Sequence, residues 1–419
     1  MNLLLKSVLI LDKASVYHKQ EKDILIKDGI IKRIDNHIDA TNKIKTIIKS
    51  NLYVSKGWFD SSVCFGEPGF EERESIENGL NTAALSGFTT VVLNTNTQPI
   101  IENKSDIAFV KDKASAHAVS LLPLGALTKR SNGEELAELF DALNAGAVGF
   151  YDYKLPISNP NLLKLALQYA QGFDGLICSY PQENNIAGNG IVNEEKTATY
   201  LGLKGIPYLA EDLQVARDLF LLEYTKGKLH IPTISTKGSV GLIREAKRKG
   251  LNISCSTTIH HLFYTDQILE GFDSNTKVLP PLRAEEDQNA LIEGVLDGTI
   301  DMVTSDHNPL NIELKKVEFD NAAFGTIGLE SAFGALNKIF DTENAIDILT
   351  RGMSRFGMES PPIKEGIKAN LTLFDPDIVY TFKRNDIYST SKNSIFIDQE
   401  LKGKPLGIIA NDQFITTLK

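Results

Sequence analysis

Cysteine and histidine are both scarce in this chain. Among its 419 residues there are seven histidines and only three cysteines, Cys64, Cys178 and Cys255. Three widely spaced cysteines cannot form a disulfide framework, and their spacing fits no zinc ribbon. We therefore expect a protein of a reducing compartment, the cytoplasm.

The chain also lacks an excess of basic residues and any long apolar run. Its formal net charge is −10, whereas a surface for nucleic acid or anionic membrane needs clustered Lys and Arg. No apolar stretch approaches the roughly 20 residues that span a bilayer. The N-terminal run MNLLLKSVLILDK is interrupted by Lys6 and Ser7, and no small-residue cleavage site follows. We expect a soluble protein without a signal peptide and without nucleic-acid or membrane partners.

Both ends of the chain have the pattern of β-strands. Residues 23–34, DILIKDGIIKRI, place Asp28-Gly29 between two apolar runs, which is a strong hairpin signal. The C-terminal stretches KANLTLFDPDIVYTF and GIIANDQFITTL have the same character. These patterns predict a small β-sandwich domain assembled from residues 1–57 and 365–419.

The middle of the chain alternates between strand and helix patterns. NGLNTAALSGFTTVVLNTN reads as a helix that ends near Gly87 and is followed by a buried strand. About eight such units over residues 58–364 predict an α/β fold, a (β/α)8 TIM-like barrel. A doubly wound sheet is the alternative, but it would need a Gly-rich phosphate-binding turn after the first strand, and none is present.

The catalytic groups of such barrels lie at the C-terminal ends of the strands. At the first of these ends the chain reads GWFDSSVCFGEPGFEERE, with Ser62 and Cys64 two residues apart and therefore on the same side of the strand. A metal site could take two ligands from this position, although serine is a poor zinc ligand. The other strand ends are polar, and the last of them carries Asp306-His307.

These strand ends, with their flanking segments, resemble dihydroorotase, a cyclic-amide hydrolase of the amidohydrolase superfamily that acts in pyrimidine biosynthesis. The resemblance covers nearly the whole chain. It rests on GEPGFEERESIENGLNTAALSGFTTVV, PPLRAEEDQNALIEGVLDGTIDMVTSDHNP, FGTIGLESAFGAL and EGIKANLTLFDP. It implies the barrel fold and a metal-dependent hydrolytic site.

The resemblance also assigns the family's metal ligands, and four of its histidines are missing. Its His-x-His pair falls on Ser62 and Cys64, its third histidine on Ser179 and its fourth on Thr233. The bridging acidic residue falls in the segment Asp152-Tyr153, where Asp152 remains. The catalytic aspartate is present as Asp306.

The positions that contact substrate in the family have changed as well. The arginine that binds the substrate carboxylate falls on Gly66, the asparagine before Pro-Pro-Leu-Arg on Leu279, and the last histidine of Asp-His-x-Pro-His on Leu310. Only the asparagine of the Pro-Asn-Thr turn is kept, as Asn96. Gly and Leu cannot replace a charged or hydrogen-bonding contact to an anion.

A metal site rebuilt from Cys64, Cys178, Asp152 and Asp306 is conceivable, but Cys178 is one residue away from the ligand position and points to the other side of its strand. The pair His260-His261 resembles the family's histidines after the sixth strand, and we interpret it as loop packing over the barrel mouth. Asp306 is then a remnant of the catalytic aspartate.

Two hypotheses follow. In the first, the chain is a catalytically inactive dihydroorotase-like subunit that works by assembly and has no cofactor. The resemblance implies a homodimer or a hetero-complex, with aspartate transcarbamoylase as the first candidate partner. In the second, it is an active dihydroorotase or another cyclic-amide hydrolase, which would require zinc.

Overall fold

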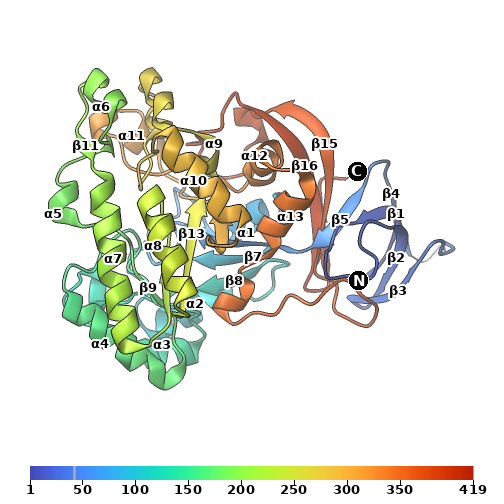
Figure 1. Cartoon of the computed structure of the whole chain (residues 1–419). Helices are drawn as coiled ribbons and strands as arrows, with labels where there is room; N and C mark the ends of the chain where they lie inside the picture. Colours follow the sequence, from blue (N-terminus) through green and yellow to red (C-terminus); the bar gives the residue numbers. More distant parts are fainter. Residues whose placement is uncertain (41–43, 419) are drawn as a thin grey trace.

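The computed structural model describes residues 1–40 and 44–418. Figure 1 shows two adjoining parts, a barrel surrounded by helices and a sheet built from both ends of the chain. The (β/α)8 barrel predicted from the strand–helix alternation is confirmed. The domain limits at residues 57 and 365 stay a prediction.

The terminal sheet has eight strands. In chain order they are β1 (Asn2–Ile10), β2 (Glu21–Lys27), β3 (Ile30–Asp35), β4 (Lys45–Ile48), β5 (Tyr53–Lys56), β15 (Leu371–Thr381), β16 (Glu400–Ala410) and β17 (Gln413–Thr416). The spatial order is β17-β16-β15-β5-β1-β2-β3, and β4 pairs with β1. The antiparallel pairing of β5 with β15 joins the two ends of the chain.

The barrel strands run parallel. They are β6 (Trp58–Val63), β7 (Phe88–Leu93), β8 (Ser120–Pro123), β9 (Ile177–Cys178), β12 (Leu229–Ile231), β13 (Ile253–Thr258) and β14 (Met302–Thr304). The fourth position is reduced to Phe150, which bridges to Gly125 on one side and Ile177 on the other. A parallel bridge between Val63 and His307 closes the ring. The short pair β10 (Val192–Asn193) and β11 (Gly205–Ile206) lies outside it.

The helices of the described residues surround the barrel strands. They are α1 (Ile76–Leu85), α2 (Lys104–Ala114), α3 (Leu139–Ala145), α4 (Pro160–Ala170), α5 (Asn184–Ala187), α6 (Lys196–Leu201), α7 (Tyr208–Thr225), α8 (Lys237–Arg248), α9 (Ile259–Phe263), α10 (Glu285–Leu296), α11 (Ile312–Lys315), α12 (Ala332–Ile339) and α13 (Thr342–Thr350). Local sequence fixes several starts. The Asn159 side chain accepts from the Asn161 amide, and Pro160 takes the first position of α4.

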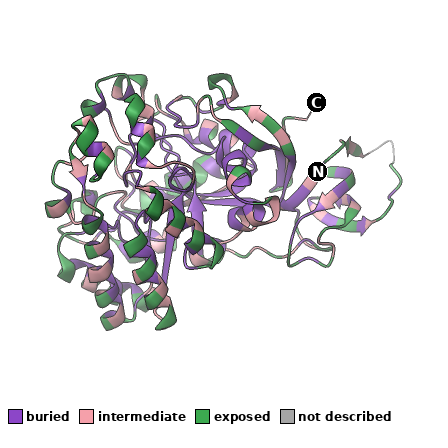
Figure 2. Ribbon diagram, turned by 45° about the horizontal axis from the view of Figure 1, so that its top comes forward, coloured by how far each residue is buried: buried purple, intermediate pink, exposed green. Residues whose placement is uncertain are grey.

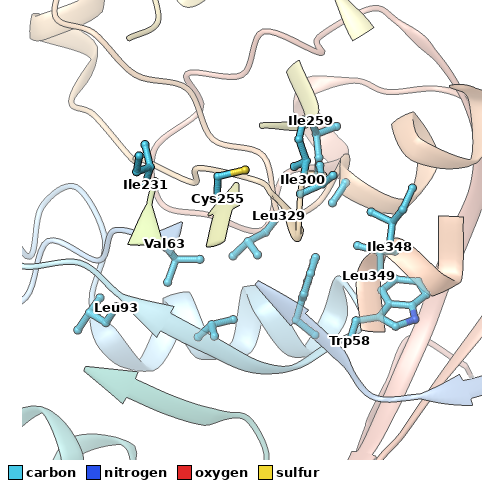
Figure 3. Close-up of a cluster of buried hydrophobic side chains, with 14 of the residues drawn as sticks. Trp58, Val63, Leu93, Ile231, Cys255, Ile259, Ile300, Leu329, Ile348 and Leu349 are labelled. Atoms are coloured by element: carbon cyan, nitrogen blue, oxygen red, sulfur yellow. The ribbon is translucent and has the colours of Figure 1, made fainter. Parts of the chain in front are cut away.

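The main core lies between the barrel strands and the surrounding helices. Figure 3 shows Val63, Leu93, Ile231 and Cys255, which come from four different barrel strands, in this buried cluster. Trp58 extends the same core toward the terminal sheet, because its ring packs against Phe333 and against Phe374 of β15. Figure 2 shows the strands buried and the outer faces of the helices exposed. Among residues 1–40 and 44–418, no helix combines the length and the apolar character needed to cross a bilayer.

Candidate functional site

An ion pair lies at the C-terminal ends of the barrel strands. Asp306 lies two residues after β14, and Lys154 lies four residues after Phe150. The Nζ atom of Lys154 is 2.7 Å from Oδ2 of Asp306. The Lys154 side chain is only 10% exposed and the Asp306 side chain only 3%. Both residues have left-handed backbone, with φ of 55° at Lys154 and 48° at Asp306. The charge of the buried carboxylate is therefore balanced by a cation that belongs to the chain itself.

Two hydroxyl groups contact the other oxygen atom of the Asp306 carboxylate. Ser62 Oγ and Tyr153 Oη each lie 3.3 Å from Asp306 Oδ1. Asn94 Nδ2, at the end of β7, donates to Ser62 Oγ at 2.9 Å and lies 3.5 Å from Cys64 Sγ. Burial raises the pKa of the Cys64 thiol to about 12. Cys64 is thus a neutral thiol near pH 7.

Asp152 takes no part in this cluster. Its carboxylate accepts from the amides of Leu127 and Thr128 at 2.8 and 3.0 Å, and also from the Thr128 hydroxyl. Burial raises its pKa, although these hydrogen bonds act in the opposite direction. Asp152 therefore fixes the loop after β8. The two residues that follow it, Tyr153 and Lys154, are the ones that reach Asp306.

The two other positions assigned to family histidines are also occupied in other ways. Ser179 Oγ donates to Asp218 Oδ2 of α7 at 2.6 Å. Cys178 and Tyr180, on either side of Ser179, join a buried cluster inside the barrel. The expectation that Ser179 faces the site and Cys178 points away from it is therefore wrong. Thr233 is buried with φ of 56°, and its Oγ1 has no hydrogen-bond partner among the described residues. Nearby His230 bonds Ser254, and burial lowers its pKa to about 3.

The histidines at the barrel mouth are buried and neutral. His261 Nε2 lies 3.1 Å from the Pro280 carbonyl, and burial lowers the pKa of His261 to about 3. His307 Nδ1 accepts from the Gly328 amide at 3.3 Å, and burial lowers its pKa to about 4. His260 is different, because neither of its ring nitrogens has a partner in the described chain.

The positions of the family's substrate contacts are filled or closed. A Cβ added to Gly66 would lie 1.9 Å from the Phe70 carbonyl oxygen, so the loop has no room for a side chain there. Leu279 packs against the buried cluster that contains Tyr180. Leu310 is buried, and its amide donates to Asn393. Asn96 remains at the mouth, with its Oδ1 unpartnered within the described residues.

These side chains do not fit a catalytic zinc. Such an ion needs three protein ligands, normally imidazole, thiolate or carboxylate. The carboxylate of Asp306 is already bound by an ammonium group, and Ser62, Ser179 and Thr233 offer hydroxyls where imidazoles would be needed. Within residues 1–40 and 44–418 no group of three or more His, Cys, Asp or Glu side chains could hold a metal ion.

Tyr153 and Lys154, which bond Asp306, were not anticipated from the sequence as residues of the site. The available signal was the position of Lys154, directly after the Asp152-Tyr153 segment at a barrel strand end. Nothing in the sequence alone indicates that its ammonium group turns toward Asp306, because Lys is usually a surface residue.

The fold is shared with solved hydantoinase structures. It matches the L-hydantoinase (dihydropyrimidinase) from Arthrobacter aurescens with a TM-score of 0.86, over 99% of this chain and 96% of that one. A D-hydantoinase crystal structure matches with a TM-score of 0.82, over 99% and 95%. Sequence identities are 22% and 19%, so this likeness concerns the fold.

Sequence comparison identifies the family more closely. A family model described as dihydro-orotase-like matches residues 53–239. A dihydroorotase of Pelotomaculum thermopropionicum is 38% identical over 99% of this chain and 98% of its own length. One from Thermoanaerobacter sp. is 39% identical over 96% and 94%. The chain belongs to the dihydroorotase family.

Proposed function

We propose that this chain is a dihydroorotase-family protein of pyrimidine biosynthesis that has lost metal-dependent hydrolysis and acts as an assembly subunit in the cytoplasm. The observation that carries the proposal is the Lys154–Asp306 ion pair of 2.7 Å, formed where the family's catalytic aspartate stands beside its metal. Hydrolysis of a cyclic amide needs an activated water and a polarised carbonyl, which the family obtains from the metal. The side chains at this site provide no substitute for the ion.

The second candidate function is an active dihydroorotase or a related cyclic-amide hydrolase. Both relatives described above are named dihydroorotase, and neither name indicates a loss of activity. The comparisons therefore support this candidate more directly than the first, whereas the side-chain geometry supports the first. An active enzyme would have to hold zinc with residues other than the missing histidines.

Complementation separates the two candidates. The chain is expressed in a bacterium whose own dihydroorotase gene has been deleted, and growth without added pyrimidine is scored. The proposal expects no growth, with an intact dihydroorotase as the positive control and immunoblotting to show that the chain is made. Growth that is lost in the Asp306→Ala variant would establish the hydrolase instead.

The assembly role requires a partner, and aspartate transcarbamoylase is the first one to test. The tagged full-length chain is purified from its native cell under mild conditions, and the co-purifying proteins are identified. The proposal expects a stable complex or a homodimer. A lone monomer, in a cell where aspartate transcarbamoylase assembles normally without it, would contradict the assembly role.

A further inference from the structure

A cleft of about 430 Å³ lies at the N-terminal ends of the barrel strands. Its walls come from the residues at the starts of β12, β13 and β14 and from residues 351–355, which follow α13. The Lys154–Asp306 ion pair lies at the opposite, C-terminal ends of the strands. The cleft is therefore separate from the barrel mouth, and its volume is in the range of roughly 300–1,000 Å³ that is usual for small-molecule sites.

Most of the charged side chains that line the cleft are cationic. The charged part of the lining is made of Lys228, Asp301, Arg351 and Arg355. Asp301 is the carboxylate among them, but its Oδ1 lies 2.7 Å from Lys247 Nζ and its Oδ2 accepts from the Cys255 amide at 2.8 Å. Because Lys247 is not part of the lining, Asp301 already has a cationic partner outside the cleft. The cleft is therefore positively charged.

Lys228 also has a carboxylate partner, whereas the two arginines have none. Lys228 Nζ lies 3.2 Å from Asp174 Oδ2. Within the part of the chain that the structure describes, neither Arg351 nor Arg355 forms an ion pair, and Asp347 attracts Arg351 only through space. Burial lowers the pKa of both guanidinium groups. A partly buried cation without a counter-ion is unfavourable, so these two arginines would be stabilised by an anion in the cleft.

The hydrogen bonds of the two arginines fix their positions without balancing their charge. Arg351 Nη2 donates to the Val295 carbonyl at 2.8 Å, and its Nη1 has no partner among residues 1–40 and 44–418. Arg355 donates from Nη1 to the Asn252 side chain and from Nη2 to the Leu229 and Asn252 carbonyls. All of these acceptors are neutral. Two guanidinium groups are thus held at the cleft with their charges uncompensated.

The rest of the lining favours a small oxyanion. Ser254 and Ser354 provide hydroxyl groups, and the described lining has no aromatic side chain on which a nucleobase could stack. Guanidinium groups match the oxygens of a phosphate in both geometry and charge. A phosphoryl group carries about −1.5 to −2 charges near pH 7, which balances two arginines, whereas a single carboxylate balances only one.

We propose that this cleft binds a phosphate group, either inorganic phosphate or the phosphoryl group of a small metabolite, through Arg351 and Arg355. The inference goes beyond the proposed function, because it holds whether the barrel mouth hydrolyses a cyclic amide or not. It assigns a ligand to the end of the barrel that is opposite to the catalytic end in this fold.

Isothermal titration calorimetry of the full-length protein, in a buffer without phosphate, tests the site. The probes are inorganic phosphate and ribose 5-phosphate, and the wild type should bind at least one of them with one site per chain. Tighter binding of ribose 5-phosphate would identify a metabolite as the ligand, and tighter binding of inorganic phosphate would identify the free ion. No saturable binding of either probe at millimolar concentration would overturn the proposal.

Two arginine variants locate the site. Arg351→Gln removes one guanidinium charge and should weaken binding by about tenfold or more. The matched control is Arg248→Gln, which changes an exposed arginine at the end of α8, outside the cleft, and should bind like the wild type. Circular dichroism shows that each variant is folded. An equal loss of affinity in both variants would mean non-specific attraction and would overturn the proposal.

Ser354→Glu tests the charge argument with both arginines in place. Ser354 is exposed in the cleft, and its hydroxyl forms no hydrogen bond within the described residues. A carboxylate at this position should act as an internal counter-ion, so it should raise the melting temperature and abolish phosphate binding. Ser354→Gln has the same size without the charge and should still bind phosphate. Binding that survives in Ser354→Glu, or is lost equally in Ser354→Gln, would contradict the role of the two arginines.

Discussion

The ammonium nitrogen of Lys154 lies 2.7 Å from a carboxylate oxygen of Asp306, and the two side chains are 10% and 3% exposed. The pair joins the segment after Phe150 to the end of β14 across the mouth of the barrel. An internal cation thus neutralises the carboxylate that the dihydroorotase family uses beside its metal. This relationship leads to several expectations about stability and metal binding.

Removing Lys154 should destabilise the fold. In Lys154→Met the Asp306 carboxylate is left buried without its counter-ion, which costs about 3–5 kcal/mol. Urea unfolding followed by circular dichroism measures the loss. The double variant Lys154→Met/Asp306→Asn is the control, because Asn removes the charge and tolerates left-handed backbone. It should recover most of the stability, and a double variant as unstable as the single one would show that the charge is not the cause.

An arginine cannot be restored at Gly66 without moving the loop. Because an added Cβ would lie 1.9 Å from the Phe70 carbonyl oxygen, even Gly66→Ala should cost about 1–3 kcal/mol. Gly172→Ala, where nothing lies within 4 Å, is the matched control and should be nearly neutral. Thermal unfolding of the two variants is compared. Equal melting temperatures would mean that the loop accommodates a side chain.

Stability should fall as the pH drops from about 6.5, the ordinary pKa of histidine. Burial lowers the pKa of His230 to about 3 and that of His307 to about 4. Below pH 6.5 the unfolded chain therefore binds protons that the folded chain does not, and each such histidine costs about 1.4 kcal/mol per pH unit. The contribution is complete above pH 6.5 and is lost progressively toward the folded pKa.

The variant His230→Asn isolates this effect from the buried carboxylates, whose raised pKa values act in the opposite direction. Denaturation is measured at several pH values between 6.5 and 5. The slope of unfolding free energy against pH should be shallower in the variant than in the wild type. Parallel slopes would exclude His230 as a source of the acid sensitivity.

Restoring histidines should not by itself restore a metal site. The variant changes Ser62, Cys64 and Thr233 to His and leaves Ser179, whose hydroxyl faces Asp218 of α7 and not Asp306. We expect it to take up zinc only when Lys154→Met is added, because Lys154 holds Asp306. Turnover should stay low in both forms, since Gly66, Leu279 and Leu310 leave the substrate without partners. Zinc is measured by elemental analysis, and zinc uptake with Lys154 intact would contradict this role of the ion pair.

Much of the fold could be predicted because periodicity and turn chemistry are local. The run FTTVVL at 88–93 predicts a buried strand and is β7, and Pro160 after Asn159 marks the start of α4. The fourth barrel strand could not be predicted accurately. Its residues 144–153 have a strand pattern, but Phe150 is the only one that bridges to both neighbouring strands. The pairing depends on how the whole ring closes.

The site was predicted less completely. A sequence shows directly that a ligand residue is missing, but it does not show which side chain now contacts the residues that remain. The missing histidines are visible at Ser62 and Cys64, but the partner of Asp306 depends on side-chain directions in three dimensions. Asp152 and Lys154 are two residues apart, yet only Lys154 reaches the cluster, because the chain turns through left-handed backbone at 154. Similarly, Ser179 faces Asp218 of α7, which no local pattern indicates.

The central claim is that an internal ammonium group has taken over the charge balance of Asp306 and that hydrolysis has been lost. Zinc content and dihydroorotate turnover, measured on one sample of the full-length protein purified with zinc present, test it most directly. The account predicts substoichiometric zinc and turnover no faster than that of the Asp306→Ala variant. Stoichiometric zinc together with turnover that depends on Asp306 would contradict it.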